Sequence, residues 1–246
     1  MARFFVPKQN IRDKQGRVVG EELDHLRRVL RLGPGDHITI FDDTGCEHEA
    51  VIRSIDAEYG NVEILGNRPA QRESTLTVTL ALGLTKGEKM DFVVEKATEL
   101  GVQFFAPFSS TYTVPKIDEK KIARRTERWR KIALSATKQC GRTRVPEIET
   151  LCELREIIKR PWADTLKLFF WEAEARQTLE QVRATVGGIR SVLVVIGAEG
   201  GFSKEEAAMA QEQGFHSVQL GPRILRAETA AVTVLALVQF LWGDMR

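Results

Sequence analysis

The 246-residue sequence has few cysteines and lacks the usual signatures of nucleotide, metal and serine-hydrolase sites. Its three cysteines form no C-x-x-C pair and are too few for a disulfide framework, which favours a reducing compartment. The P-loop pattern G-x-x-x-x-G-K-[ST], the dinucleotide fingerprint G-x-G-x-x-G and the elbow G-x-S-x-G are absent. The four histidines have no metal-type spacing and H-E-x-x-H does not occur, so we expect no bound metal.

Long hydrophobic runs are also missing. The longest, Ala230–Trp242, has about 13 residues, whereas a helix that spans a bilayer needs roughly 20. We expect this run to form a helix buried on most sides, in a core or a subunit interface. The N-terminal residues MARFFVPKQN contain no apolar signal-peptide core. The sequence therefore predicts a soluble, cytoplasmic protein with no membrane contact.

The first part of the chain has the pattern of short strands joined by tight turns. Residues 36–41, 47–55 and 60–65 are the strand candidates, and DDTG at 42–45 supplies turn residues. One helix is predicted at 21–32, ended by Gly33-Pro-Gly35. The polar stretch 66–74 contains a proline and is predicted to be a linker. These features indicate a small barrel-like domain over residues 1–68.

The pattern changes after residue 75. A strand at 75–82, a helix at 88–100 and a strand at 102–106 form one βαβ unit, which implies a parallel sheet. Further strands are predicted at 166–171, 191–196 and 217–220, with helical stretches between them. We therefore predict an α/β domain over residues 75–246.

Basic residues are concentrated between Lys116 and Arg144. This segment holds eleven lysines and arginines against three acidic residues, although the whole chain has a formal net charge of only +2. Clustered positive charge suits a nucleic-acid backbone. A solvated helix face would have the same composition. The run alone does not decide between the two.

A glycine loop follows the apolar strand at 191–196. Gly197, Gly200 and Gly201 would let the backbone approach a nucleotide-like ligand, and Ser203 with Glu206 has the spacing of a capping box. Glu199 lies in the middle of this loop, where it would repel a phosphate. A neutral or cationic ligand such as S-adenosylmethionine fits better. Glu199 could equally cap the following helix.

A second loop precedes the C-terminal helix. Ile224 and Leu225 are apolar residues in a loop, which favours walls for a flat ligand, and they separate Arg223 from Arg226. The alternative is that both arginines lie on the surface and that Glu228 only begins a helix.

Five segments, in this order along the chain, together resemble the ribosomal RNA small subunit methyltransferase E family of the SPOUT superfamily. They are KGEKMD (86–91), EKATELGV (95–102), QCGR (139–142), GAEGGFS (197–203) and LGPRILRAETA (220–230). In the first domain, VLR (29–31), GD (35–36) and FDDTG (41–45) are similar to the family as well. Ala198 departs from the pattern, since proline is frequent there in the family; the change should alter loop rigidity more than activity.

The resemblance implies a fold and a reaction that spacing alone does not reach. The fold would be a PUA-like, RNA-binding β-barrel followed by a SPOUT α/β domain with a deep trefoil knot, which binds the donor and forms a homodimer. The reaction would be methyl transfer from S-adenosylmethionine to N3 of one uridine in 16S ribosomal RNA of the small subunit.

The resemblance also implies site residues. Arg226 is the first candidate to stabilise the negative charge of the deprotonated uracil, and Glu199 could accept the N3 proton or only hold the loop or the ribose. Donor-binding candidates are Leu82, Ile196, Gly197, Glu199, Gly200, Gly201, Leu220, Gly221, Ile224, Leu225, Glu228 and Thr229. RNA-binding candidates are Arg3, Lys8, Arg12, Lys86, Arg142 and Arg223.

Three other functions stay open. The same loops would permit another SPOUT reaction, such as methylation of a ribose 2′-hydroxyl. A non-catalytic protein could use the fold to bind ribosomal RNA, although the retained glycines favour a donor pocket. A protein-interaction module would use the apolar C-terminal helix as a dimer interface and bind neither donor nor RNA.

Overall fold

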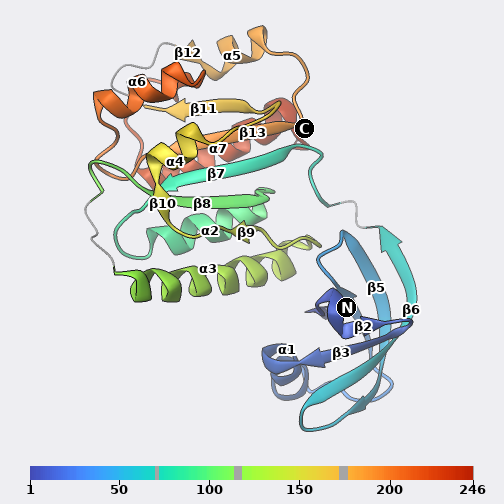
Figure 1. Cartoon of the computed structure of the whole chain (residues 1–246). Helices are drawn as coiled ribbons and strands as arrows, with labels where there is room; N and C mark the ends of the chain where they lie inside the picture. Colours follow the sequence, from blue (N-terminus) through green and yellow to red (C-terminus); the bar gives the residue numbers. More distant parts are fainter. Residues whose placement is uncertain (70–71, 114–117, 172–176, 246) are drawn as a thin grey trace. The chain divides into compact units, whose positions relative to one another are not determined.

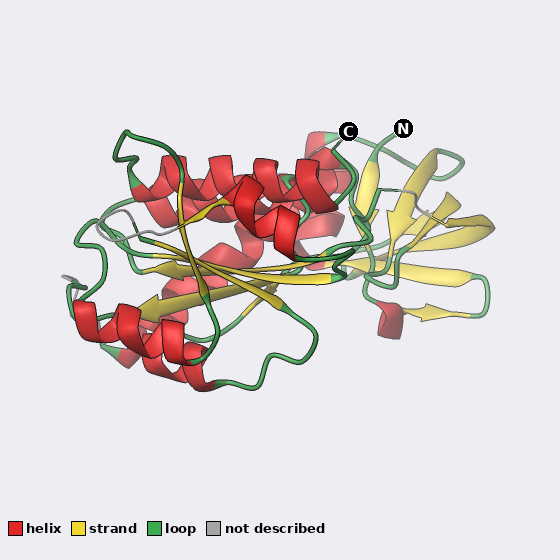
Figure 2. Cartoon of the chain, turned by 90° about the horizontal axis from the view of Figure 1, so that it is seen from above, coloured by secondary structure: helices red, strands yellow, loops and turns green. Residues whose placement is uncertain are grey.

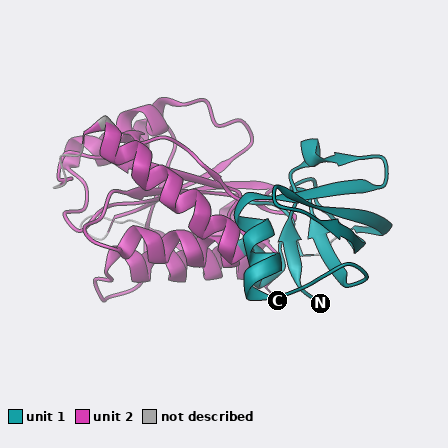
Figure 3. Ribbon diagram, turned by 90° about the horizontal axis from the view of Figure 1, so that it is seen from below, with its two compact units in different colours: residues 1–73, 137–145 teal, residues 74–136, 146–246 magenta. Residues whose placement is uncertain are grey.

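The computed structural model describes residues 1–69, 72–113, 118–171 and 177–245 of the chain (Figure 1). They form two compact units, coloured separately in Figure 3. Unit 1 is Met1–Glu73 with Thr137–Val145, and unit 2 is Ser74–Ala136 with Pro146–Arg246. Residues 137–145, which the sequence places in the second domain, thus belong to unit 1. Within the described residues, no helix is both long and apolar enough to cross a bilayer.

Unit 1 is built on a six-stranded sheet whose strand order is β1-β4-β5-β6-β3-β2. Its neighbouring strands pair antiparallel except for β1 and β4, which are parallel. The strands are β1 (Arg3–Phe5), β2 (Ile11–Arg12), β3 (Gln15–Val19), β4 (His37–Phe41), β5 (Cys46–Ile55) and β6 (Tyr59–Pro69), with a 3₁₀ turn at Lys8–Asn10. The alternating side chains of these strands build a core around Phe4, Ile40 and Ile52. The three predicted strands of this region are confirmed.

Two predictions for unit 1 need correction. The helix expected at 21–32 is shorter: α1 (Gly20–Asp24) passes into a π-helical turn, His25–Val29, and the chain leaves the helix at Arg31, whose φ is +53°. The linker expected at 66–74 begins later, because β6 continues to Pro69. The long partner strand β5 supplies a ladder as far as the Cys46–Pro69 pair. Strand pairing therefore outweighs the local breakers.

Unit 2 contains a parallel sheet with the strand order β10-β8-β7-β13-β11-β14-β12, and β9 pairs with β8. The strands are β7 (Thr77–Gly83), β8 (Phe104–Ser109), β9 (Glu147–Ile148), β10 (Cys152–Glu153), β11 (Leu166–Phe170), β12 (Gln177–Thr178), β13 (Ser191–Ile196) and β14 (His216–Gln219). Every pairing is parallel, as the βαβ pattern predicts. β13 and β11 are buried almost throughout, which explains their continuous apolar runs.

Helices lie on both faces of this sheet (Figure 2). They are α2 (Lys89–Glu99), α3 (Glu119–Cys140), α4 (Leu154–Lys159), α5 (Leu179–Thr185), α6 (Lys204–Glu212) and α7 (Ala227–Trp242). α2 packs against α7, and α4 packs against α6. α7 buries one side of the long apolar run, but Leu237 and Phe240 remain exposed.

Candidate active site

A cavity of about 280 Å³ lies in unit 2, at the carboxyl ends of three neighbouring parallel strands, β11, β13 and β14. In α/β proteins this edge of the sheet is where ligands bind. The volume is near the lower end of small-molecule sites, roughly 300–1,000 Å³. Its lining residues are Phe170, Trp171, Ile196, Gly197, Ala198, Glu199, Gly201, Phe202, Val218, Gln219, Leu220, Gly221, Arg223, Ile224, Leu225, Arg226, Ala227 and Ala230.

The glycine loop forms a tight turn between β13 and α6. The N–H of Gly201 donates to the carbonyl of Ala198 at 2.9 Å, and Gly201 has a φ of +65°, which favours glycine. The predicted capping box is confirmed: Ser203 accepts from the N–H of Glu206, whose carboxylate accepts from the N–H of Ser203. Since Ser203 caps α6, Glu199 is free of that role, and it is among the residues that line the cavity.

The backbone of the glycine loop is closely packed from outside the cavity. A Cβ atom added to Gly83, at the end of β7, would lie 2.3 Å from the backbone nitrogen of Ala198. A Cβ at Gly200 would lie 2.7 Å from the Cβ of Tyr112. Both distances are too short for a side chain, so glycine at these two positions lets the end of β7 and Tyr112 pack directly against the loop; among the described residues, neither glycine is in the cavity lining.

We predict that Gly83→Ala destabilises the protein by about 1–3 kcal/mol, since it overpacks a site where only backbone can yield. The displaced loop should also weaken binding of S-adenosylmethionine in calorimetry. Gly188→Ala is the matched control, because a Cβ there meets no atom within 4 Å. Equal stability and equal binding of the two variants would contradict the assigned contact.

The second loop, between β14 and α7, supplies apolar and cationic groups. Gly221 has a φ of +100°, and Ile224 is 80% exposed. Arg226 is the N-cap residue of α7 but its side chain makes no capping hydrogen bond. Arg223 and Arg226 are both exposed, and both are among the residues that line the cavity.

Glu199 is held from the side of α2. Its Oε1 accepts from the Lys89 ammonium at 2.7 Å and from the N–H of Lys86 at 3.4 Å. Partial burial opposes ionisation of the carboxyl, but these donors outweigh it and hold the pKa of Glu199 below its usual value. A carboxylate that is ionised and ion-paired at neutral pH is a weak proton acceptor. This favours the loop-holding role over that of a base.

The structure gathers most, though not all, of the predicted donor residues. Four of them are absent from the cavity lining, as far as the described residues show: Leu82, Gly200, Glu228 and Thr229. Leu82 is buried at the end of β7, opposite Ile196 of β13, and Thr229 is exposed on α7. The sequence analysis missed Phe170, Trp171, Phe202 and Val218. The positions of the predicted strand ends were the signal for Phe170, Trp171 and Val218, whereas Phe202 lies within the GAEGGFS segment that resembles the family.

These residues fit S-adenosylmethionine, which combines a neutral adenosine with a cationic sulfonium. Leu220, Ile224 and Leu225 offer apolar walls to a flat base, and the glycine backbone permits close approach. Glu199 would disfavour a phosphate but not a cation, and its own charge is already paired with Lys89. Among the described residues, no group of three or more His, Cys, Asp or Glu side chains is arranged to hold a metal.

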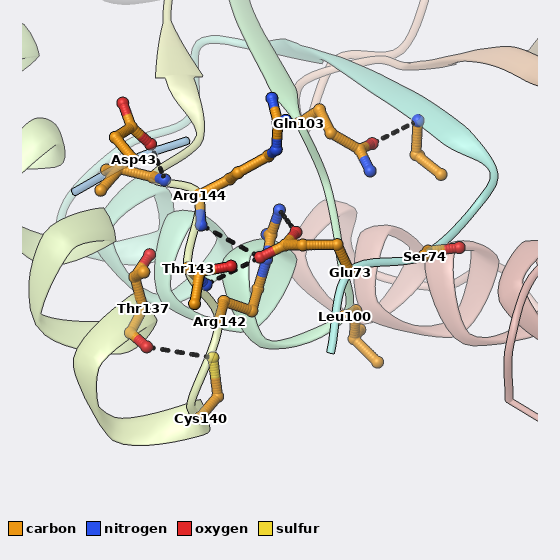
Figure 4. A network of polar contacts seen from close by, with 12 residues as sticks. Asp43, Glu73, Ser74, Leu100, Gln103, Thr137, Cys140, Arg142, Thr143 and Arg144 are labelled. Carbon is orange, nitrogen blue, oxygen red and sulfur yellow. Dashed lines mark hydrogen bonds and ion pairs between the residues drawn. The ribbon is translucent and has the colours of Figure 1, made fainter. Parts of the chain in front are cut away.

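Two predicted RNA contacts in unit 1 have a different role. Arg142 is 3% exposed, and its guanidinium donates to Glu73 from Nε at 3.1 Å and from Nη2 at 2.9 Å (Figure 4). Arg3 pairs with Glu47 at 2.7 Å and donates to the carbonyls of Lys138 and Arg142. A guanidinium that is buried or satisfied internally is not available to a phosphate. These placements do not support the predicted contacts.

The other predicted RNA contacts are on the surface. Lys8 has a side chain that is 68% exposed, and Arg12 and Lys86 are exposed as well. In the basic segment, α3 buries Trp129 and presents Lys120, Lys121 and Arg124 to solvent. Lys116 lies outside the described residues. Most of this segment is thus a helix whose basic side chains face solvent. Such a surface is compatible with binding to a nucleic-acid backbone and equally with a solvated helix face that binds nothing.

Comparisons with known proteins agree with this site. A family described as RNA methyltransferase domain matches residues 72–239, and one described as RNA methyltransferase PUA domain matches residues 20–65. The ribosomal RNA small subunit methyltransferase E of Bacillus subtilis (strain 168) is 31% identical over 98% of this chain and 96% of its own. That of Aquifex aeolicus (strain VF5) is 33% identical over 85% and 93%.

Solved structures of methyltransferases are also similar to this chain. The ribosomal RNA small subunit methyltransferase E from Neisseria gonorrhoeae, bound to S-adenosylmethionine, has a TM-score of 0.89 at 33% identity and covers 100% of both chains. A Legionella pneumophila protein, in complex with S-adenosylmethionine, has a TM-score of 0.88 at 32% identity and covers 98% of each chain.

Proposed function

Because the chain belongs to the ribosomal RNA small subunit methyltransferase E family, we propose that it transfers a methyl group from S-adenosylmethionine to N3 of one uridine in 16S ribosomal RNA. The observation that carries the proposal is the cavity in unit 2. It combines a glycine loop, a carboxylate, apolar walls and two guanidinium groups at the carboxyl edge of a parallel sheet.

The two loops would hold the donor. Gly197 and Gly201 admit its close approach, and Leu220, Ile224 and Leu225 enclose its base. When bound, S-adenosylmethionine supplies a methyl group made electrophilic by the sulfonium. The remaining task of the protein is to position and polarise the uracil.

Arg226 would stabilise the reacting uracil. N3 of uridine carries a proton at neutral pH, and its loss places negative charge on O2 and O4. A guanidinium fixed beside the cavity stabilises that charge without reorganisation. Arg223 is the second candidate, for charge stabilisation or for a phosphate. Glu199, ionised and paired with Lys89, would orient the glycine loop, and we assign the proton to no side chain.

RNA binding would divide between the units. Unit 1 would be the PUA-like barrel, with Lys8 and Arg12 as phosphate contacts, and the exposed basic face of α3 would add to it. The target uridine would leave its base stack to enter the cavity. The free-energy cost of unstacking and unpairing a base is lowest in an unpaired loop. The predicted domain boundaries, 1–68 and 75–246, belong to this proposal.

The remaining family features are proposed on the same basis. The second domain would contain the trefoil knot, formed by the segments around the glycine loop and the 220–226 loop. A homodimer would cover the apolar side chains of Phe92, Leu237 and Phe240, which are 46%, 37% and 58% exposed. The substrate, assembled in the bacterial cell interior, would place the protein in the cytoplasm.

The test uses methyl-labelled donor with purified small ribosomal subunits that lack the modification, followed by mapping of the labelled nucleotide by mass spectrometry. Label at N3 of a single uridine is the expected result. Label on a ribose or another base would keep a methyltransferase and overturn the assigned acceptor atom. Absence of both label and calorimetric donor binding would favour a non-catalytic RNA-binding protein.

A further inference from the structure

Lys89 contacts two carboxylates, one from the glycine loop and one from the first turn of α7. It lies in the first turn of α2, and its Nζ is 2.7 Å from Oε1 of Glu199 and 3.6 Å from Oε2 of Glu228. Glu199 belongs to the glycine loop. Glu228 lies in the first turn of α7, directly after the cavity residues Arg226 and Ala227. One ammonium group therefore connects both loops through side chains that are distant in the sequence.

The two carboxylates need a shared cation. The Oε2 atom of Glu228 is inaccessible to solvent and accepts no hydrogen bond from the described residues, and the Lys89 ammonium lies 3.6 Å from it, so this ammonium offsets part of the cost of burying that oxygen. Since both carboxylates approach the same nitrogen, they also lie close to each other. Without the cation they would repel, and the loops that carry them would separate.

The segment that carries Lys89 is packed against both the glycine loop and α7, which fixes the position of this residue. α2 packs against α7, and β7, which leads into α2, presses Gly83 against the backbone of Ala198. The N–H of Lys86 adds a second donor to Glu199 from the same segment. The hydrogen bond to Glu199 also raises the pKa of Lys89 above its ordinary value, so the side chain stays charged at neutral pH.

We propose that Lys89 is a positioning residue of the donor site. Its ammonium neutralises Glu199 and Glu228 together and so keeps the glycine loop and the start of α7 at the separation that the donor requires. The inference rests on the proposed function, because it takes the cavity to be the S-adenosylmethionine site. Lys89 itself is absent from the cavity lining among the described residues, so it acts through the two carboxylates.

The same helix provides a matched control. Lys96 lies two turns further along α2, and its Nζ is 2.7 Å from Glu95 and 2.8 Å from Glu99. Both lysine side chains are 32% exposed, and each is shared between two carboxylates. The difference is that the partners of Lys96 are on its own helix, whereas those of Lys89 belong to the cavity loops.

The experiment is donor binding by calorimetry, with thermal unfolding measured in parallel. We expect Lys89→Met to raise the Kd for S-adenosylmethionine about tenfold and Lys89→Arg to stay within about threefold of the parent. Lys96→Met should bind as the parent does. With Glu228→Gln as background, Lys89→Met should lose less affinity than it does alone, because one of the two charges it neutralises is gone.

Each alternative outcome has a definite meaning. Parent-like binding by Lys89→Met, or an equal loss in Lys96→Met, would overturn the positioning role. If Lys89→Met unfolds, a loss of donor affinity well beyond threefold in the folded Lys89→Arg variant would do the same, since arginine keeps the positive charge. Absence of binding by the unsubstituted protein would overturn the proposed function itself, and this inference with it.

Discussion

Replacing Arg226 with alanine is expected to lower the rate of methyl transfer by about 10²–10³-fold and to leave the Kd for S-adenosylmethionine within about threefold. Arg226 is among the residues that line the cavity, and in the proposed reaction negative charge would develop there on the uracil oxygens as N3 loses its proton. An interaction that strengthens only in the transition state affects the rate constant rather than ground-state binding of the donor.

The fold should tolerate this substitution. Arg226 is exposed, and its side chain makes no capping hydrogen bond to α7, so alanine removes neither packing nor a cap. The rate is best measured in single turnover with saturating donor and small ribosomal subunits, and donor affinity by calorimetry. This pair of measurements separates the chemical step from binding.

Arg223→Ala serves as the comparison, since Arg223 lies in the same loop and lines the same cavity. We expect a smaller loss of rate, and a loss of affinity for the ribosomal subunit if this guanidinium binds a phosphate. An equal fall in rate and donor affinity for Arg226→Ala would remove Arg226 from the chemistry. A larger rate effect at Arg223 would exchange the two roles.

Much of the cavity in unit 2 could be predicted because its determinants are local in the sequence. The apolar run at 191–196 predicts a strand, and the glycines that follow it predict a tight loop. Ser203 and Glu206 then predict a capping box at the start of a helix. β13, the glycine turn and the capping box appear where the pattern predicts them. The second loop was predictable for the same reason, since apolar residues in a loop are unusual.

The partners of these residues could not be predicted, because they depend on contacts between distant segments. Nothing near Glu199 in the sequence indicates that Lys89 will neutralise it, and nothing near Gly83 indicates the contact with Ala198. Phe170 and Trp171 reach the cavity only because β11 lies between β13 and β14 in the sheet. Strand order is a property of the whole fold.

Arg142 shows how charge alone can mislead. Its position near the end of a strongly basic segment suggests a phosphate contact, and composition contains no information about burial. In the structure the guanidinium of Arg142 donates hydrogen bonds to Glu73, which is the last residue of the first segment of unit 1 and is distant from Arg142 in the sequence (Figure 4). A basic residue beside a glycine and a threonine in a turn is as compatible with an internal ion pair as with a ligand.

This ion pair leads to the largest expected effect on stability. Glu73→Ala should lower the free energy of unfolding by about 3–5 kcal/mol, because it removes the carboxylate that is paired with the buried guanidinium of Arg142. The carboxylate of Glu73 also accepts from the N–H groups of Thr143 at 2.8 Å and Arg144 at 3.0 Å. The substitution therefore removes the acceptor of four hydrogen bonds from the 142–144 turn.

Urea denaturation and thermal unfolding would measure this effect, and a fall in Tm of roughly 10 °C is expected for a chain of this length. Glu63→Ala is the matched control in the same unit. Glu63 also pairs with an arginine, Arg53, at 2.7 Å, but the side chains are 41% and 58% exposed. An exposed pair contributes only about 0–1 kcal/mol, so this variant should be close to the parent.

A double substitution separates the two parts of the Glu73 effect. Glu73→Leu combined with Arg142→Met removes both charges of the ion pair, while the N–H groups of Thr143 and Arg144 still lose their acceptor. It should be more stable than Glu73→Leu alone, because an uncompensated buried charge costs more than unpaired amides. If the double variant is as unstable as the single one, the amide hydrogen bonds rather than the ion pair fix this turn. If Glu73→Ala is no less stable than Glu63→Ala, the buried pair is not a determinant of the fold of unit 1.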